Sequence, residues 1–327
     1  EIHWRDWSSD VCSSDLGSRG IVVSASGLSP NKYTLTLSAR DLSRKTPPPL
    51  SASIFVEPPA VTRGAAELYQ ARPLADAVVY QLMVDRFRGE KGALAAPTTP
   101  GHRAGGTLDG IRAAIEAGYF QRLGVTTLWL SPLYQNPTGF WSGRDGRNYQ
   151  AYHGYWPIAP RTVEPLFGGE AALSALLAAA HSRGLRVIFD AVPNHVHEQH
   201  PYYRAHSRQS PPIAQADDAE ARTWFHDGPR QCVCGAPGCS WGERIEDCWF
   251  ALYLPDLNWR HPEVLQAGVD DLLWWLTRFD LDGMRIDAVP MMPRAASRRI
   301  VRATRNAVAR SGLDSLLIGE DYTGPGQ

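Results

Sequence analysis

Hydrophobic positions follow one period near the start of the chain and a different one in the rest of it. Tyr33, Leu35 and Leu37 alternate with threonine and serine, which is the two-residue period of a half-buried strand. Further apolar stretches flank this one. We therefore expect residues 21–57 to be part of an antiparallel β-sandwich module, and residues 58–73, which contain prolines, to be a linker.

From residue 74 onward, short apolar runs alternate with amphipathic stretches. The stretch 108–123 has Thr107 as an N-cap before it, and the stretch 170–183 places its leucines on one helical face. The apolar runs predict strands at 78–85, 125–132, 185–192, 283–289 and 315–321. Apolar strands separated by helices are typical of a parallel sheet that helices cover.

Acidic residues stand where these strands end. Asp85, Asp190, Asp287 and Glu320 each lie at or near the C-terminal end of a different strand. Functional groups of a parallel β/α barrel collect at that face. A doubly wound sheet would normally add a glycine-rich phosphate turn, which the sequence lacks. We therefore predict an α/β fold over residues 74–327, the first five strands of a TIM-type (β/α)8 barrel.

Composition and charge narrow the class of protein. The 327 residues are 43 % hydrophobic, and 33 basic side chains against 34 acidic ones give a net charge of −1. Nothing in this balance favours nucleic acid or an anionic membrane as a partner. No lysine follows Lys91, so no later residue can form a Schiff base. Motifs for dinucleotides, nucleoside triphosphates, zinc proteases and serine hydrolases are absent.

Two connections are much longer than an ordinary βα loop. They follow the second and third predicted strands, at 133–168 and at about 196–255. Long loops on the catalytic face of a barrel are where substrate sites are built. The first loop is rich in aromatic side chains, which predict a binding platform, with a local core as the alternative: Tyr134, Phe140, Trp141, Tyr149, Tyr152, Tyr155 and Trp156.

The fourth and fifth strands carry a pair of carboxylates suited to glycoside cleavage. Arg285 and Asp287 are two residues apart, so both point toward the barrel axis, and the cation should lower the pKa of Asp287 and keep it ionised. Glu320 ends an apolar strand, where partial burial should raise its pKa and suit a general acid. One ionised and one protonated carboxyl group are what this reaction needs. Ordinary ion pairs at the barrel mouth are the alternative for each residue taken alone.

Several segments, in order, resemble the signature segments of the alpha-amylase superfamily of glycoside hydrolases. They are GVTTLWLSPL (124–133), AYHGYW (151–156), DAVPNH (190–195), LPDLN (254–258), GMRIDAV (283–289) and GED (319–321). The resemblance covers about 74–327 and implies the barrel fold.

By this resemblance, Asp287 is the nucleophile and Glu320 the acid/base. Arg285 holds Asp287 ionised, His195 bonds a sugar hydroxyl, and Tyr155 stacks on the glucose ring at the point of cleavage. A satisfied core histidine is the alternative for His195.

Two further residues follow from the same resemblance. Trp156 is expected to contribute to substrate binding, and Asn194 resembles a residue that often ligates calcium. The reaction itself would need no cofactor, and any calcium would be structural.

Four cysteines of the second long loop fall within a short stretch: Cys232, Cys234, Cys239 and Cys248. Their clustering favours a structural zinc site, while the single residue between the first two argues against one. Two disulfides are the equal alternative, with three connectivities. Disulfides would indicate a secreted or periplasmic protein.

We expect a retaining glycosidase or glucanotransferase that acts on α-linked glucose polymers such as starch and maltodextrins. Within the superfamily, a disaccharide isomerase or transferase is the alternative. A barrel kept as a non-catalytic binding module is the second alternative, and the presence of Asp287 and Glu320 argues against it. The oligomeric state stays open.

Both ends of the chain carry an expectation. Residues 1–20 lack strand or helix periodicity and resemble translated adapter DNA, so we expect a non-native leader. In the superfamily pattern a third catalytic aspartate follows the seventh strand, and this sequence, which ends after the fifth predicted strand, does not contain it. We therefore expect a truncated barrel that is inactive alone.

Overall fold

The computed structural model describes residues 74–97, 99–207, 223–226, 232–309 and 315–321, together with four short strands nearer the N-terminus. The chain forms two compact units, residues 1–58 and 59–327. In the first unit, β3 (Asn31–Leu37) and β4 (Leu50–Val56) pair antiparallel along their whole length, and β1 (Ile2–His3) pairs with β2 (Ser24–Ala25). The predicted linker lies outside the described residues, as does the predicted leader apart from Ile2–His3.

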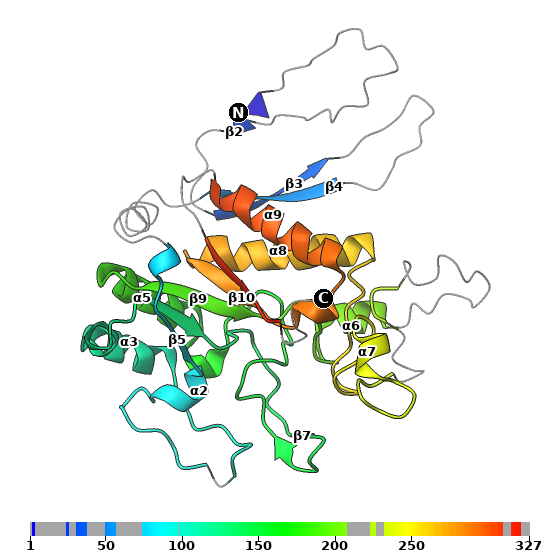
Figure 1. Cartoon of the computed structure of the whole chain (residues 1–327). Helices are drawn as coiled ribbons and strands as arrows, with labels where there is room; N and C mark the ends of the chain where they lie inside the picture. Colours follow the sequence, from blue (N-terminus) through cyan, green and yellow to red (C-terminus); the bar gives the residue numbers. More distant parts are fainter. Residues whose placement is uncertain are drawn as a thin grey trace, which may run out of the picture. The chain divides into compact units, whose positions relative to one another are not determined.

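The second unit is built on a five-stranded parallel sheet (Figure 1). Its order is β11-β10-β9-β6-β5, and each pair of neighbours is parallel. The strands are β5 (Val79–Leu82), β6 (Thr127–Leu130), β9 (Arg186–Ala191), β10 (Gly283–Ile286) and β11 (Leu316–Gly319). From β5 at one edge to β11 at the other, successive strands lie beside one another as in a barrel, which confirms the predicted parallel α/β fold.

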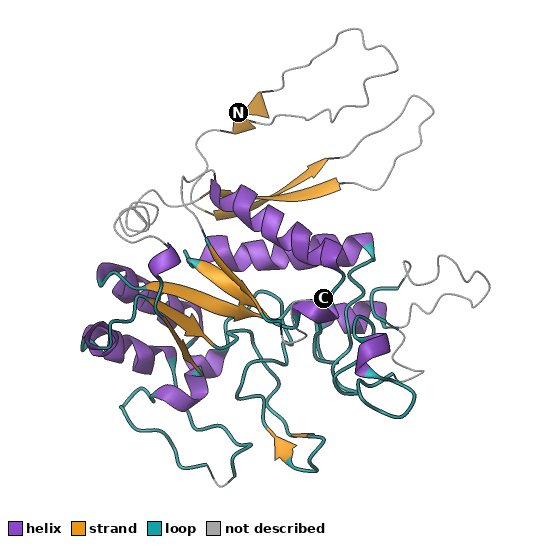
Figure 2. Ribbon diagram, viewed as in Figure 1, coloured by secondary structure: helices purple, strands orange, loops and turns teal. Residues whose placement is uncertain are grey.

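Helices connect and cover these strands (Figure 2). The α-helices of the sheet region are α2 (Val84–Phe87), α3 (Leu108–Glu116), α4 (Tyr119–Arg122), α5 (Gly169–Ser182), α8 (Pro262–Arg278) and α9 (Arg294–Ala309). Helix α3 packs on α5 and α8 packs on α9, while short 3₁₀ turns span Leu74–Asp76, Pro165–Phe167 and Val289–Met291. Thr107 caps α3 as predicted, because its Oγ1 accepts a hydrogen bond from the Gly110 amide at 3.1 Å.

One predicted helix is in fact two. The stretch 108–123 breaks at Gly118, whose φ of 72° lies in the left-handed region that glycine adopts readily. Hydrophobic periodicity continues across the break, so the pattern alone did not reveal it.

The two long loops are confirmed and carry short elements of their own. The first contains the hairpin of β7 (Trp141–Ser142) and β8 (Asn148–Tyr149). The second contains α6 (Pro201–His206) and α7 (Trp241–Arg244). In the described part of the chain, no helix has the length and apolar character that crossing a membrane requires.

Candidate active site

Acidic residues from three adjacent strands meet at one edge of the sheet. Asp190 lies in β9 and is the register partner of Arg285 in β10. Asp287 directly follows β10, and Glu320 directly follows β11. Because the carboxyl ends of parallel strands share an edge, side chains distant in sequence become neighbours.

A single guanidinium joins the three carboxylates. Arg285 Nη1 donates to Asp190 Oδ1 at 2.5 Å and to Asp287 Oδ1 at 2.7 Å. Arg285 Nη2 forms an ion pair with Glu320 Oε1 at 2.9 Å. The structure thus brings together the predicted pair and its arginine, and it adds Asp190. One cation faces three acids, so these acids compete for it.

The pKa of Asp287 moves in the direction opposite to the expectation. Burial raises the pKa of Asp287 to about 7, although the charge of Arg285 acts to lower it. Asp190 and Glu320 raise it further by like-charge repulsion. The pKa of Asp190 is also raised, because burial outweighs its bond to Arg285. The cost of desolvating the Asp287 carboxylate therefore outweighs the attraction of the neighbouring cation.

Glu320 is the most open of the three acids. Its side chain is 36 % exposed, against 12 % for Asp287 and 0 % for Asp190. Glu320 lies just beyond the end of the strand, so its side chain is only partly buried. Its Oε2 accepts a hydrogen bond from the Ala288 amide at 2.8 Å. Ala288 has a φ of 54°, a strained conformation for a residue with a side chain.

Asp190 is held by side chains from two other segments. The Tyr155 hydroxyl donates to Asp190 Oδ2 at 2.7 Å, and Trp129 Nε1 donates to the same oxygen at 3.1 Å. Trp129 was not predicted. Trp129 lies in β6, within the segment 124–133 that resembles the superfamily, but its apolar neighbours gave no reason to assign it a polar contact.

His195 lies beside Tyr155. His195 Nε2 is 3.0 Å from the Tyr155 carbonyl oxygen, and its buried Nδ1 has no hydrogen-bond partner among the described residues. Burial lowers the pKa of His195 to about 4, so the ring is neutral at pH 7. With Nε2–H donating to the carbonyl, Nδ1 is the atom left to accept a bond from a hydroxyl group.

Trp156 does not offer the exposed ring face that a sugar platform needs. It is only 8 % exposed, and its ring meets the edges or faces of Trp141, His153 and Tyr253 at centroid distances of 5.7, 4.6 and 5.2 Å. Aromatic residues of the first loop thus largely form a local core. Tyr155 packs against the small core cluster that contains Trp156.

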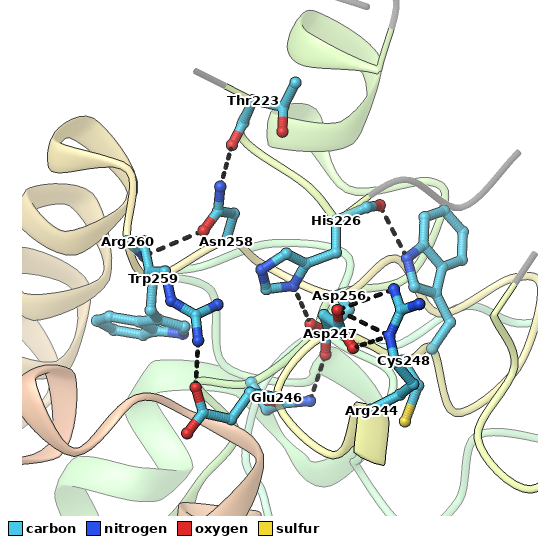
Figure 3. Close-up of polar contacts among 12 residues, drawn as sticks. Thr223, His226, Arg244, Glu246, Asp247, Cys248, Asp256, Asn258, Trp259 and Arg260 are labelled. Atoms are coloured by element: carbon cyan, nitrogen blue, oxygen red, sulfur yellow. Dashed lines mark hydrogen bonds and ion pairs between the residues drawn. The ribbon is translucent and has the colours of Figure 1, made fainter. Parts of the chain in front are cut away.

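His226 of the second long loop and Asp256, just after it, belong to a polar cluster (Figure 3), and Asn194 is bonded to Asp256. Asn194 Nδ2 donates to Asp256 Oδ1 at 2.7 Å, and His226 Nδ1 lies 2.7 Å from Asp256 Oδ2. Asn194 Oδ1 is buried without a partner, but the described residues contain no group of three or more histidine, cysteine or acidic side chains that could hold a metal. Calcium takes six to eight oxygen ligands. The described arrangement does not fit calcium, because both oxygens of Asp256 already face protein nitrogens. His226 was not predicted.

The four loop cysteines form two disulfides. Cys232 pairs with Cys239, and Cys234 pairs with Cys248. This arrangement is the disulfide alternative from the sequence, and it leaves none of the four sulfurs as a thiolate for zinc.

A parallel β/α sheet with functional groups clustered at its carboxyl edge is typical of barrel enzymes. Residues 81–310, more than half of the chain, match the family model described as alpha amylase, catalytic domain. The chain belongs to the alpha-amylase superfamily of glycoside hydrolases.

Relatives from several organisms agree with this assignment. Alpha-amylase 3 of Schizosaccharomyces pombe is 30 % identical over 66 % of this chain and 36 % of its own length. The cyclomaltodextrin glucanotransferase of Geobacillus stearothermophilus is also 30 % identical, over 66 % of this chain and 31 % of its own. This chain therefore spans about a third of the length of these curated relatives.

Solved structures show the same fold. An alpha-amylase from Geobacillus thermoleovorans, complexed with acarbose, is 28 % identical with a TM-score of 0.59. The match covers 77 % of this chain and 48 % of that one.

Proposed function

We propose that this protein acts on the α-glucosidic bonds of starch-type glucans as a retaining glycoside hydrolase or glucanotransferase. The observation that carries the proposal is the cluster of Asp190, Asp287 and Glu320 on the guanidinium of Arg285. Names of relatives support the substrate class, since they include alpha-amylases, alpha-glucosidases and a cyclomaltodextrin glucanotransferase.

The exposure of the three acids supports the roles proposed for them. Asp190 is fully buried and accepts bonds from three side chains, so it fixes the geometry of the site. Asp287 is largely buried beside the arginine, as a nucleophile shielded from water should be. Glu320 is open enough to exchange a proton with a leaving group and with water, which is the task of a general acid/base.

The reaction would proceed by double displacement. A carboxylate oxygen of Asp287 attacks the anomeric carbon while the bond to the glycosidic oxygen breaks, and Glu320 gives that oxygen its proton. Water, or the hydroxyl group of an acceptor sugar, then attacks the glycosyl ester of Asp287. Glu320 takes up the proton of this second nucleophile, which regenerates both side chains.

The attack requires an ionised Asp287. Burial raises the pKa of Asp287 to about 7, so part of its carboxyl groups carry a proton near neutral pH in the free site. A bound sugar places Asp287 against the anomeric carbon, where positive charge develops and favours the ionised carboxylate.

Tyr155 provides the test of substrate binding, measured by calorimetry with maltoheptaose. Tyr155→Ala removes the ring expected to stack on glucose and should weaken binding at least about tenfold, whereas Tyr155→Phe keeps the ring and should stay within about threefold. If the unsubstituted protein binds no α-glucan, the proposed function is wrong. Any turnover of starch should disappear in both Asp287→Asn and Glu320→Gln.

The two disulfides support a place outside the reducing cytosol. Disulfides persist in oxidising compartments, so we propose that the protein is secreted or periplasmic.

A further inference from the structure

Two aromatic side chains extend from the candidate site onto the disulfide-bonded loop. The ring of Phe250 contacts that of His195, with centroids 5.0 Å apart and ring planes at 76°. The ring of Trp241 lies 6.0 Å beyond Phe250, tilted by 39°. Since His195 also contacts the backbone of Tyr155, the rings form a continuous series that starts at the acids.

The disulfides anchor Phe250 at this position. Cys248, two residues before it, pairs with Cys234, and Phe250 packs against the cysteine cluster on one side. It also packs against the cluster of Ala151, Trp156 and Leu254. Phe250 therefore joins the disulfide-bonded loop to the aromatic loop that carries Tyr155.

A residue of the first long loop fastens the two loops together. Arg144 Nη2 donates to the carbonyl oxygen of Cys234 and, at 3.3 Å, to that of Phe250. These bonds connect the hairpin region of the first loop to both ends of the segment 234–250, which contains Trp241 and Phe250.

Trp241 is exposed, although neighbouring residues pack closely against its ring. It is 38 % exposed and begins α7, with Ser240 Oγ accepting a bond from the Glu243 amide at 3.3 Å. The turn at Gly235, with a φ of 79°, approaches it so closely that an added Cβ would lie 2.9 Å from Trp241 Nε1. A large ring fixed by its surroundings and left open to solvent is suited to binding a ligand rather than filling a core.

We propose that Trp241 and Phe250 form a binding platform for the glucose units of an α-glucan that lie beyond the unit held at Tyr155 and His195. This inference rests on the proposed function. The C–H face of a glucose ring is apolar and packs on aromatic faces, so two neighbouring rings suit two neighbouring sugars. The rings of Trp241 and Phe250 continue from His195, which lies beside the acid cluster. A ligand on these rings would therefore be the continuation of the glucan chain that is bound at the acids.

The test compares the affinity of maltoheptaose for single variants of the full chain by calorimetry. Trp241→Ala should weaken binding about fivefold to tenfold, and Trp241→Phe should restore it to within about twofold of the unsubstituted protein. Leu252→Ala is the matched control, because Leu252 lies in the same loop and is 59 % exposed but carries no ring. Leu252→Ala should bind as the unsubstituted protein does.

The outcomes separate the platform from the proposed function. If the unsubstituted protein binds maltoheptaose and responds to Tyr155→Ala, but Trp241→Ala binds equally well, only the platform is refuted. If the unsubstituted protein binds no α-glucan, both proposals fall. If Trp241→Ala changes the oligomeric state by size-exclusion chromatography and leaves the affinity unchanged, the exposed ring serves a second copy of the chain, and the platform is likewise overturned. Circular dichroism of each variant checks that it is folded.

Discussion

Replacing Asp287 by asparagine should stabilise the protein at alkaline pH. The pKa of Asp287 is raised from its ordinary 3.8 to about 7, first by burial and against the attraction of Arg285. A carboxyl group whose folded pKa is raised opposes folding once the unfolded chain ionises. This penalty is absent below about pH 4, grows from there, and is complete above about pH 7. Asparagine has nearly the same shape and never ionises.

The magnitude follows from the displacement of the pKa. Each unit by which the pKa is displaced corresponds to about 1.4 kcal/mol of unfolding free energy. Coupling among the three acids reduces the total penalty, so Asp287→Asn should raise the free energy of unfolding by about 2–4 kcal/mol at pH 8.5. At pH 4 the two proteins should agree within about 0.5 kcal/mol. Arg285 retains Asp190 and Glu320 as partners, so the substitution leaves no unpaired cation.

Urea unfolding followed by tryptophan fluorescence at pH 4, 6 and 8.5 measures this difference. Glu116→Gln is the control, because its side chain is 50 % exposed on α3 and should change stability by less than about 0.5 kcal/mol at every pH. A gain for Asp287→Asn that does not depend on pH, or a loss of stability at pH 8.5, would refute the reasoning about desolvation.

Three other features have measurable consequences. His181→Gln should destabilise the protein more at pH 5.5 than at pH 9. Burial lowers the pKa of His181, but the hydrogen bond and charge of Asp282 outweigh burial, so the pKa is raised. The stabilisation from protonated His181 is therefore present below about pH 6.5 and is lost as the histidine deprotonates. Equal losses at both pH values would contradict this. Thr107→Ala removes the cap of α3 and should cost about 1 kcal/mol in urea unfolding, while Thr107→Ser should cost much less. Titration of the oxidised, unfolded protein should find a thiol only at Cys12, and reduction should release four more; a larger count before reduction would contradict the pairing.

The strand order and the location of the acids could be predicted from the sequence, because both follow from local patterns. Apolar runs mark buried strands, and a residue that directly follows such a run must lie at the carboxyl edge of a parallel sheet. This rule is enough to place Asp287 beside Glu320 before any coordinate is known. It also places Asp190 at the same edge, although its contact with Arg285 depends on register.

Properties that depend on packing could not be predicted in this way. The pKa of Asp287 depends on how completely the surrounding segments exclude water, which no local pattern specifies. Trp156 and Tyr155 are adjacent in the chain, yet one ring is buried and the other reaches Asp190. The contact of Phe250 with His195 depends on which cysteines pair, and spacing allowed three pairings.

The most direct test of the account is to trap the covalent intermediate. The protein, expressed from its complete reading frame, is incubated with an activated fluorinated α-glucosyl donor, whose glycosyl ester is hydrolysed slowly, and its peptides are sequenced by mass spectrometry. The account predicts one added glycosyl group on the carboxylate of Asp287, and no labelling of the Asp287→Asn variant. A label on Glu320, or one that persists in Asp287→Asn, would contradict it.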